Sequence, residues 1–351
     1  YIYAVKYPKF SDFTWTVIIT LPILTYIHLR GYLLALTYDE CWTFLGYAQG
    51  DIWSTITNRH PAANNHVFHS LLVTVSQWLI GDSEYAIRLP SLLAFIPFTY
   101  FLIQILRTLP PRKWLLGLAF ILYQPYLLDY FVAARGYSIA LAMMLGAIWS
   151  MMQFLDTRDQ KKLLMATILA GLAAYTNFTF ILFLAVFIFV SAVVVIRKKW
   201  PMQSKTKLGI FLILTTTFAL IAIPLKKLVT AEELYYGGVS DFFHDTMMSM
   251  AFSIQYQSGY ALPLAILLSA LPFYLGFKLM RTRENEGLVL IWTTGVLIAI
   301  SSIAQHFILG TPYLIDRTAL ILLPYFLLFL HFQMTPSSKS KKEGPSLTGL
   351  F

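Results

Sequence analysis

The sequence has 351 residues, of which 58% are hydrophobic and only 12% are charged, and its mean hydropathy is +0.65. This composition excludes a soluble globular protein and predicts an all-α polytopic membrane protein, because no soluble core needs so much apolar surface. The net charge of +9 does not indicate nucleic-acid binding, since 19 of the 26 Lys and Arg residues lie in six short clusters beside apolar blocks. One cysteine, Cys41, excludes an internal disulfide, and no Cys/His pattern predicts a metal site.

The six basic clusters predict which side of the membrane each loop occupies. They are Lys6 with Lys9; Arg107, Arg112 and Lys113; Arg158, Lys161 and Lys162; Arg197 to Lys207; Lys278 to Arg283; and Lys339 to Lys342. Loops rich in Lys and Arg stay in the cytoplasm, so all six clusters are predicted to be cytoplasmic.

The apolar blocks between these clusters predict helical hairpins. Residues 114–155 would form a helix about 63 Å long, twice the hydrocarbon core of roughly 30 Å, so this block must cross the membrane and return. The same reasoning applies to 163–196, 208–277 and 288–334. Each hairpin then has its tip outside the cytoplasm.

The first block, 10–106, contains a span near 13–33, another near 88–105, and mixed sequence between them. Residues 66–80 are apolar but too short to span, and a span there would move every later basic cluster to the other side. We therefore expect an interfacial helix at 66–80. The prediction is about ten transmembrane helices in five hairpins, with both termini cytoplasmic.

This topology divides the chain into a transmembrane domain, 1–334, and a polar cytoplasmic tail, 335–351. Two long loops, 34–87 and 226–258, are expected outside the cytoplasm. Ionisable residues near the membrane are costly and usually functional, and most of those outside the clusters fall on this extracytoplasmic face. We expect the active face there, in a multi-pass membrane protein.

Asp39 and Glu40 directly follow the first span, in the segment TYDECW. An acid pair in this place is compatible with a general base, a metal ligand or a solvated helix cap. Adjacent side chains on a helix point about 100° apart, so the two carboxylates are not expected to act as an equivalent pair. One of them should dominate.

The segment NRHPAANNHVFH follows in the same loop and is rich in polar side chains. They are Arg59, His60, Asn64, Asn65, His66 and His69. His66 and His69 share a helix face, which is compatible with a metal pair but is more typical of an amphipathic helix that turns polar groups to water.

Two arginines lie at predicted outer tips, where a helix re-enters the membrane. Arg135 lies beside Tyr137 in DYFVAARGYS, and an arginine at this depth needs an anion, either Asp129 or a phosphate. Arg317 follows Asp316 before the last helix and repeats the arrangement. Two such arginines favour an anionic lipid ligand.

The loop KKLVTAEELYYGGVSDFFHD also faces outward and contains Lys226 and Lys227. Gly237 and Gly238 give its backbone freedom, and its aromatic residues would suit either a cover for a substrate or an aromatic belt at the membrane interface.

The order of these motifs resembles the GT-C glycosyltransferases, in particular the bacterial branch related to protein O-mannosyltransferases and the aminoarabinose transferase of lipid A. Those proteins carry DE after the first helix, an HPP-like segment, GDSExxxRLPS at the second helix and an arginine at the tip before the fourth. The matching positions here are Asp39 with Glu40, His60 with Pro61, GDSEYAIRLPS at 81–91, Arg135 in AARGYS, and Arg317 in YLIDRTALILLPYF.

The chain departs from the family in two respects. Ala62 replaces the second proline of HPP, and no soluble domain follows the last helix, which we interpret as a minimal enzyme or a truncated chain.

The resemblance implies a GT-C fold and a membrane glycosyltransferase that moves a hexose or pentose from a polyprenyl-phosphate donor to an acceptor hydroxyl, with inversion, on the extracytoplasmic face. The acceptor would be a glycan, a lipid or a protein. The phosphate leaving group needs no general acid, so the site requires a carboxylate base and cations for the phosphate. Asp39 is the predicted base, with Glu40 orienting it or binding the sugar.

The predicted phosphate ligands are Arg135 and Arg317. His60, Arg59, Lys226, Lys227, Tyr137 and Asn65 are lesser candidates for substrate binding. No cofactor is expected with certainty, no metal ligands are assigned, and a divalent cation stays possible. The alternatives are a transporter or flippase for lipid-linked sugars and a non-catalytic membrane partner in lipid-linked glycan assembly.

Overall fold

The computed structural model describes residues 10–108, 111–252 and 286–334, with a few positions between 253 and 285, and the described part is almost entirely helical. The helices of the first half are α1 (Phe10–Leu33), α2 (Tyr38–Trp42), α3 (Ile52–Ile56), α4 (Val67–Ile80), α5 (Glu84–Leu93), α6 (Phe95–Leu106), α7 (Pro111–Leu122), α8 (Pro125–Val132), α9 (Tyr137–Thr157) and α10 (Gln160–Thr176). The later helices are α11 (Ile181–Arg197), α12 (Ser204–Thr230), α13 (Met248–Phe252), α15 (Glu286–Leu309), α16 (Asp316–Ala319) and α17 (Leu323–Met334). Short π and 3-10 segments are η1 (Thr43–Ala48), η2 (Phe178–Phe180) and η3 (Phe243–Met247).

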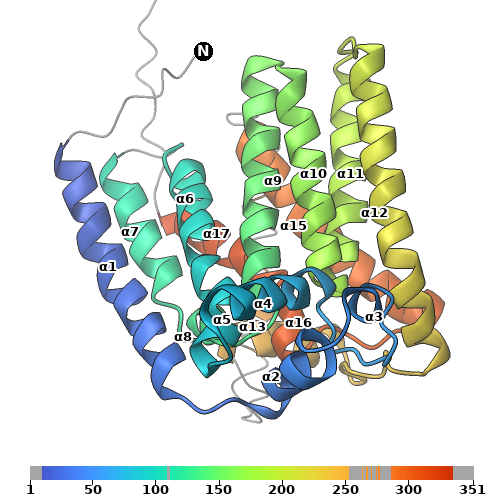
Figure 1. Cartoon of the computed structure of the whole chain (residues 1–351). Coiled ribbons are helices and arrows are strands. Elements are labelled where there is room, and N and C mark those ends of the chain that lie inside the picture. The colour runs from blue at the N-terminus through green and yellow to red at the C-terminus, as the bar shows by residue number, and fades with distance from the viewer. Residues whose placement is uncertain are drawn as a thin grey trace, which may run out of the picture.

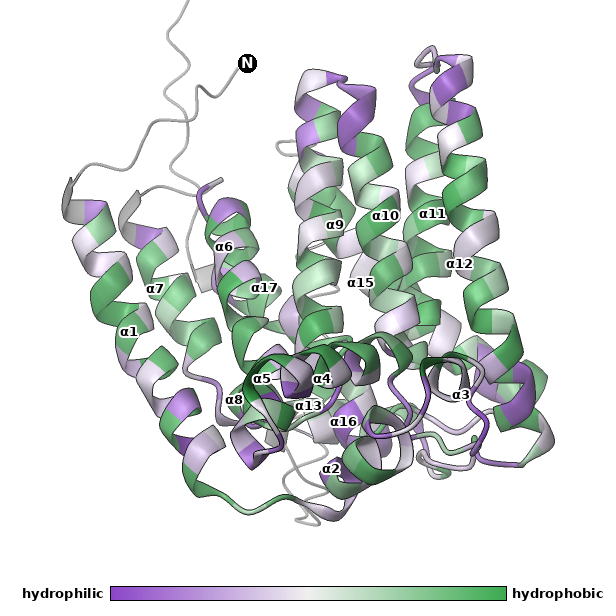
Figure 2. Cartoon of the chain, viewed as in Figure 1, coloured by the Kyte–Doolittle hydropathy of each residue, from purple (hydrophilic) through white to green (hydrophobic). Residues whose placement is uncertain are grey.

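The long helices run side by side, and the short helices α2 to α5, α8, α13 and α16 gather at one end of the bundle (Figure 1). We call this the site end. The opposite end carries the turns between α9 and α10 and between α11 and α12, and we call it the basic end. Hydrophilic residues cap the helices at the basic end, whereas the middle of each helix is mostly hydrophobic (Figure 2).

Six helices of the described residues are long and apolar enough to cross a membrane. They are Asp12–Leu33, Glu84–Leu106, Tyr137–Thr157, Phe178–Arg197, Ser204–Thr230 and Glu286–Leu309, and the bent pair α7 and α8 makes a seventh if it counts as one span. The chain is therefore a multi-pass membrane protein of the all-α class.

The predicted number of ten spans is confirmed only in part. Among the described residues, α10 has 17 residues and α17 has 12, so both are shorter than the roughly 20 residues that cross the hydrocarbon core. The second half of the predicted hairpin 208–277 falls largely outside the described residues. The predicted interfacial helix does form, as α4, and its place relative to a membrane stays a prediction.

The centre of the bundle is α9, which is buried along most of its length and packs against α6, α10 and α15. Close packing, more than the hydrophobic effect, holds helices together in lipid, and small residues permit it. At Gly146 an added Cβ would come within 2.7 Å of the Phe101 ring, and at Gly171 within 2.6 Å of the Thr217 hydroxyl. These glycines let α9 approach α6 and let α10 approach α12.

Two prolines shape the helices that lead to the site end. Pro97 has no N–H to donate to the Leu93 carbonyl, and the span Glu84–Leu106 is interrupted nearby, at Ala94. Pro125 begins α8, which is bent by 61° from α7. This bend places the turn that follows α8, residues 133–136, under the bundle at the site end (Figure 1).

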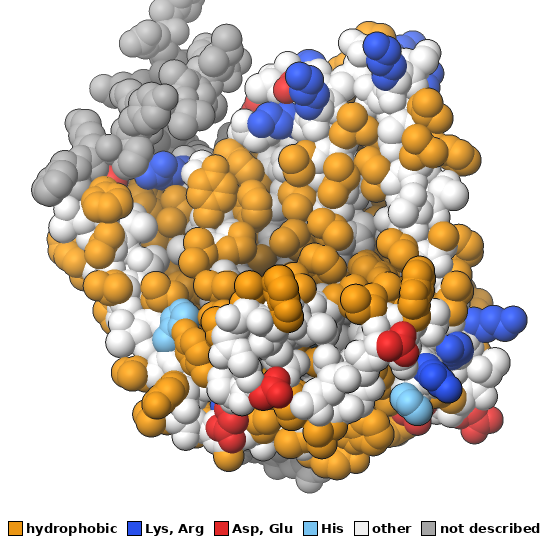
Figure 3. All heavy atoms as spheres, viewed as in Figure 1, with side chains coloured by type: hydrophobic (Ala, Val, Ile, Leu, Met, Phe, Trp, Pro, Cys, Tyr) orange, Lys and Arg blue, Asp and Glu red, His pale blue; other side chains and the backbone are white. Residues whose placement is uncertain are grey.

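The two ends of the bundle differ in their charged side chains. Blue Lys and Arg atoms predominate at the basic end, with a few red acids beside them, while acids, histidine and cations are mixed at the site end (Figure 3). The described residues of the predicted cytoplasmic clusters, such as Arg158 and Lys198, flank the turns at the basic end. The described basic clusters of the sequence therefore lie at one end of the bundle, and the candidate functional residues lie at the other.

Candidate functional site

Asp39 lies at the site end, in the first turn of α2, and three side chains bond its carboxylate. Its Oδ2 accepts hydrogen bonds from Arg135 Nη1 and from Arg317 Nη1, the latter at 3.1 Å. Its Oδ1 accepts a hydrogen bond of 2.7 Å from Asn64 Nδ2. Two guanidinium groups thus share one carboxylate oxygen.

Asn64 also joins the acid to one of the arginines. Its Oδ1 accepts a 2.7 Å hydrogen bond from Arg135 Nη2 while its Nδ2 donates to Asp39. The three side chains form a closed ring of hydrogen bonds, which fixes the carboxylate and the guanidinium relative to each other. The four residues come from α2, the loop before α4, the turn before α9, and α16.

The cluster is partly open to the surroundings. The side chain of Asp39 is 24% exposed and that of Arg317 is 22% exposed, whereas that of Arg135 is only 8% exposed. A ligand can therefore reach the acid and one face of the arginine pair. We call Asp39, Asn64, Arg135 and Arg317 the acid–arginine cluster.

Glu40, the next residue, is fully buried, with a side-chain exposure of 1%. Arg88 donates to both of its oxygens at 2.8 Å, and the backbone N–H groups of Thr37 and Ala134 each donate at 2.8 Å. Burial alone would raise the pKa of Glu40, but the Arg88 guanidinium and the two backbone donors outweigh it and lower this pKa. Its oxygens are occupied, so the predicted role of orienting the site fits this carboxylate better than sugar binding.

Arg88 in turn holds the end of the first helix. It donates to the backbone carbonyl oxygens of Gly31 at 3.1 Å and Ala35 at 2.8 Å, and also to that of Leu34. The segment that connects α1 to α2 is therefore tied to α5. The segment GDSEYAIRLPS supplies this arginine, and its Ser83 caps α5 by accepting from the Ala86 N–H at 3.1 Å.

The backbone around Arg135 is bonded on both sides. The Ala134 N–H donates to Glu40 Oε1, and the Ser91 hydroxyl donates to the Arg135 carbonyl at 3.1 Å. Ser91 also bonds His69 Nε2 at 3.1 Å. These contacts position Arg135 beside Asp39.

Aromatic rings surround the two arginines. The Arg135 guanidinium carbon lies 5.9 Å from the Tyr137 ring centre, and that of Arg317 lies 4.0 Å from the Tyr236 ring centre. The Tyr236 hydroxyl donates to Asp316 Oδ2 at 3.0 Å. Burial, together with the charge of Asp316, raises the pKa of Tyr236 to about 12, so this hydroxyl remains a donor at neutral pH.

Tyr236 reaches Arg317 because its loop is paired with the segment before α16. Gly238 and Tyr313 exchange two backbone hydrogen bonds, of 2.9 and 2.8 Å. At Gly237 an added Cβ would come within 2.2 Å of Pro312, so the two segments approach too closely for a side chain at this position. The aromatic part of the second long loop therefore belongs to the wall of the site.

Several of the lesser candidates lie apart from the acid–arginine cluster. Lys226 is exposed and Lys227 is half-buried, both near the end of α12. Arg59 and His60 are exposed, and His60 uses its backbone carbonyl to accept from the Tyr47 hydroxyl at 3.0 Å. Their proposed roles remain predictions.

Asn65 is buried and bonds neighbouring residues of its own loop. Its amide donates at 3.0 Å to the Thr55 carbonyl and to Asn58 Oδ1, and its oxygen accepts from the Ser70 hydroxyl at 3.1 Å. These bonds fold the loop before α4, and the predicted substrate-binding role of Asn65 remains a prediction.

The sequence alternative in which Asp129 neutralises Arg135 is wrong for this structure. Asp129 bonds Arg30 of α1 instead, because α8 presents it to the surface beside α1, whereas the turn after α8 carries Arg135 toward Asp39. Sequence reasoning also missed the bridging role of Asn64 and the pairing of Arg88 with Glu40. One feature of the sequence could have indicated Asn64: it closely follows His60 and Pro61 in the segment NRHPAANNHVFH.

His66, which precedes α4, and His69, in its first turn, are buried and neutral. Burial, with a smaller contribution from Arg135, lowers the pKa of His69 to about 3 and lowers that of His66 well below its ordinary value. The described residues contain no group of three or more His, Cys, Asp or Glu side chains that could hold a metal ion. The described part of the chain therefore offers no metal cage around the acid–arginine cluster.

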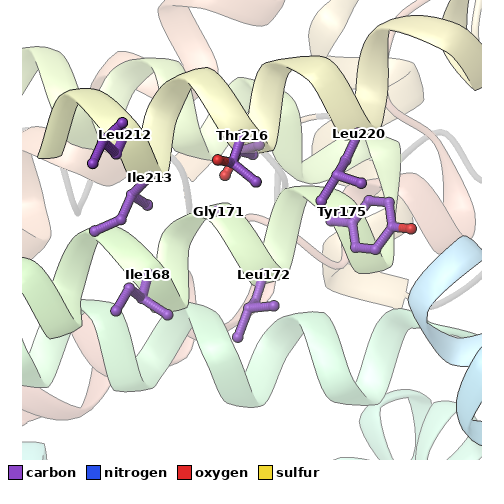
Figure 4. Close-up of a pocket in the computed structure, with 9 residues that line it drawn as sticks. Ile168, Gly171, Leu172, Tyr175, Leu212, Ile213, Thr216 and Leu220 are labelled. Carbon is purple, nitrogen blue, oxygen red and sulfur yellow. The ribbon is translucent and has the colours of Figure 1, made fainter. Parts of the chain in front are cut away.

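A separate groove of about 300 Å³ lies between α10 and α12 (Figure 4). Its lining residues are Ile168, Gly171, Leu172, Tyr175, Leu212, Ile213, Thr216, Thr217 and Leu220. The lining is mostly apolar and includes none of the four residues of the acid–arginine cluster, so this groove is not the candidate catalytic site.

Comparison with known proteins supports the predicted resemblance. Residues 60–223 match the family described as dolichyl-phosphate-mannose-protein mannosyltransferase. This range includes His60, Asn64, Arg88 and Arg135. Among curated proteins no sequence matches the chain significantly.

Two crystal structures of ArnT from Cupriavidus metallidurans share the fold. The structure bound to undecaprenyl phosphate has a TM-score of 0.58 and 14% sequence identity, and the similarity covers 92% of this chain and 60% of the ArnT chain. The apo structure has a TM-score of 0.59 and 12% identity, covering 93% of this chain and 60% of ArnT. This chain therefore spans about 60% of the length of ArnT.

Proposed function

We propose that this chain is a membrane glycosyltransferase that uses a polyprenyl-phosphate sugar donor. Two findings support the proposal: residues 60–223 match the mannosyltransferase family, and the chain shares the GT-C fold of ArnT. The sugar is transferred to an acceptor hydroxyl with inversion at the anomeric carbon. One observation carries this proposal: Arg135 and Arg317, 182 residues apart in the sequence (317 − 135), converge on one oxygen of Asp39.

The arginine pair fits a phosphate. Guanidinium groups offer several N–H donors in one plane and bind phosphate oxygens in pairs. Two guanidinium charges face one Asp39 carboxylate, so these three residues leave one positive charge for an anion. The ArnT structure, which holds undecaprenyl phosphate on the same fold, supports a ligand of this class.

Asp39 is the base in this proposal. Its carboxylate takes the proton of the acceptor hydroxyl as the acceptor oxygen forms a bond to the anomeric carbon. The bond from that carbon to the phosphate oxygen breaks, and its electron pair leaves with the polyprenyl phosphate. Arg135 and Arg317 stabilise the phosphate charge, so no general acid is needed.

The surrounding residues keep these groups in place. Asn64 bonds both Asp39 and Arg135, and the buried pair of Glu40 and Arg88 holds the backbone on either side of them. Positioning of this kind accelerates a reaction because the reacting groups need no further ordering.

The site end is extracytoplasmic in this proposal, in a bacterial inner membrane. The described basic clusters lie at the opposite end of the bundle, which is the arrangement that the positive-inside rule predicts (Figure 3). A donor assembled on a lipid would then meet Asp39 on the outer side.

The proposal is tested with Asp39→Asn in the full chain. We expect donor consumption with a panel of polyprenyl-phosphate sugars and cell-envelope acceptors to fall by about 10²- to 10⁴-fold, the usual contribution of a general base. The thermal stabilisation that the donors give should persist, because both arginines remain. Asp82→Asn is the matched control and should retain full activity, since Asp82 is an exposed acid whose one side-chain partner among the described residues is Gln77.

Full activity of Asp39→Asn would remove the proposed base. If no polyprenyl-phosphate sugar stabilised or reacted with the wild-type chain, the glycosyltransferase proposal would give way to a transporter or a non-catalytic partner.

A further inference from the structure

His66 is a buried polar side chain that takes no part in the proposed reaction. It precedes α4 and is only 5% exposed, and its Nε2 is buried without a hydrogen-bond partner. Buried polar atoms are nearly always bonded in native proteins, since an unpaired one costs free energy. Other described residues also have such atoms, but the one in His66 lies next to the candidate substrate site, where a ligand can supply the partner.

His66 is next to the arginines of the site. Its ring packs edge-on against Tyr137, with ring centres 5.2 Å apart, and the Arg135 guanidinium carbon lies 5.9 Å from the centre of the same Tyr137 ring. Arg135 and Arg317 are both close enough to contribute to the lowered pKa of His66. The imidazole is therefore neutral, and Nε2 can donate or accept a hydrogen bond according to its tautomer.

The position of His66 is fixed from behind. At Gly136 an added Cβ would lie 2.9 Å from the His66 Cβ and 2.8 Å from the Thr176 carbonyl oxygen. The close contact with Gly136 leaves the His66 Cβ no room to move toward the turn that carries Arg135. A side chain held this firmly can select between ligands that differ in one hydroxyl group.

Tyrosine rings pack beside His66. The Tyr137 ring centre is 5.2 Å from that of Tyr130, which in turn is 5.4 Å from that of Tyr126. Tyr126 and Tyr137 are buried, and Tyr130 is half-buried. A cluster of aromatic rings with one partly exposed ring and one polar nitrogen suits a sugar, which has apolar C–H faces and hydroxyl groups at its rim.

The charges of the site favour an uncharged sugar. A cationic amino sugar would need a carboxylate, but Asp39 is already paired with Arg135 and Arg317, and Glu40 with Arg88. Asp316 accepts a hydrogen bond from the Tyr236 hydroxyl and directly precedes Arg317. The two arginines would also repel the ammonium group of an amino sugar.

We propose that His66 binds a hydroxyl group of the transferred sugar through Nε2, beside the phosphate held by Arg135 and Arg317, and that this sugar is uncharged. The inference rests on the proposed function. It adds a sugar-binding residue and a class of sugar to it.

The test compares two ligands in the purified full chain: polyprenyl phosphate without a sugar, and the same lipid carrying a neutral hexose. His66→Leu should weaken binding of the hexosyl lipid about tenfold, the loss expected for one hydrogen bond in a desolvated site, and leave binding of the sugar-free phosphate within about twofold. His66→Gln, which retains a hydrogen-bonding side chain, should recover part of the loss. His244→Leu is the control, because His244 is exposed and bonded to Asp241.

A second comparison tests the class of sugar. The wild-type chain should bind the hexosyl lipid at least about tenfold more tightly than a lipid carrying an amino sugar of the same ring size. Equal or tighter binding of the amino sugar overturns the inference.

The outcomes separate this inference from the function on which it rests. If wild-type chain binds neither lipid, the proposed function fails and the inference fails with it. If both lipids bind and His66→Leu affects neither, or weakens both equally, only the inference is overturned.

Discussion

Asp39 and Glu40 are neighbours in the sequence, yet their carboxylates have opposite surroundings. Glu40 is 1% exposed and its oxygens are bonded by one arginine and two backbone N–H groups. Asp39 is 24% exposed, and its partners are side chains from three distant segments. Burial with complete bonding is typical of a structural ion pair, whereas partial exposure between two cations is typical of a site that a ligand enters.

The largest expected effect concerns the buried pair. Arg88→Met leaves the Glu40 carboxylate buried without its cation, and we expect a loss of about 3–5 kcal/mol in the free energy of unfolding, measured by thermal or denaturant unfolding. Arg30→Met is the matched control. The pair of Arg30 and Asp129 is 33% and 50% exposed, so its loss should cost under about 1 kcal/mol.

The double variant Glu40→Leu with Arg88→Met sharpens this test. It removes both charges, so part of the stability should return. Activity should not return, because the Ala134 N–H and the carbonyls at the end of α1 lose their partners and Arg135 loses its support. If Arg88→Met alone were as stable as the wild type, the pair of Glu40 and Arg88 would not stabilise the fold.

A smaller effect is expected at the exposed cluster. Arg317→Gln should weaken binding of polyprenyl phosphate about 10- to 100-fold, the range for a hydrogen bond to a charged group, with little change in melting temperature. Ligand-dependent thermal stabilisation measures it. If Arg317→Gln lost much stability but bound polyprenyl phosphate as tightly as the wild type, Asp39 would belong to a structural ion pair like that of Glu40.

The smallest effect is expected at the end of α12. Lys226→Ala and Lys227→Ala should change donor affinity by no more than about twofold, since exposed or half-buried charges contribute little and no hydrogen bond or ion pair joins these lysines to the acid–arginine cluster among the described residues. A tenfold loss in either variant would show that α12 moves toward the donor when it binds.

Much of the arrangement follows from the sequence. The basic clusters predict which helix ends lie together, and this alone places Asp39, Arg135 and Arg317 at the same end of the bundle. The structure adds that they meet at one carboxylate oxygen. Their catalytic roles stay predictions.

The sequence could not predict which cation bonds which acid. Asp129 and Arg135 are six residues apart, yet the end of α8 lies between them and turns their side chains to different neighbours. Arg88 and Glu40 are 48 residues apart, and their pairing depends on the packing of α5 against α1 and α8. Helix length was a second difficulty, because α10 and α17 are shorter than the apolar blocks that contain them.

The distance along the chain between Asp39 and Arg317, 278 residues, has a consequence for biogenesis. At about 5–20 residues per second, ribosomal synthesis separates the two residues by roughly a quarter of a minute to a minute. During that interval the acid and Arg135 can already be paired in the membrane, but the second cation is missing. If the proposed function holds, the nascent protein stays inert toward lipid-linked substrates until α16, which carries Arg317, has been made.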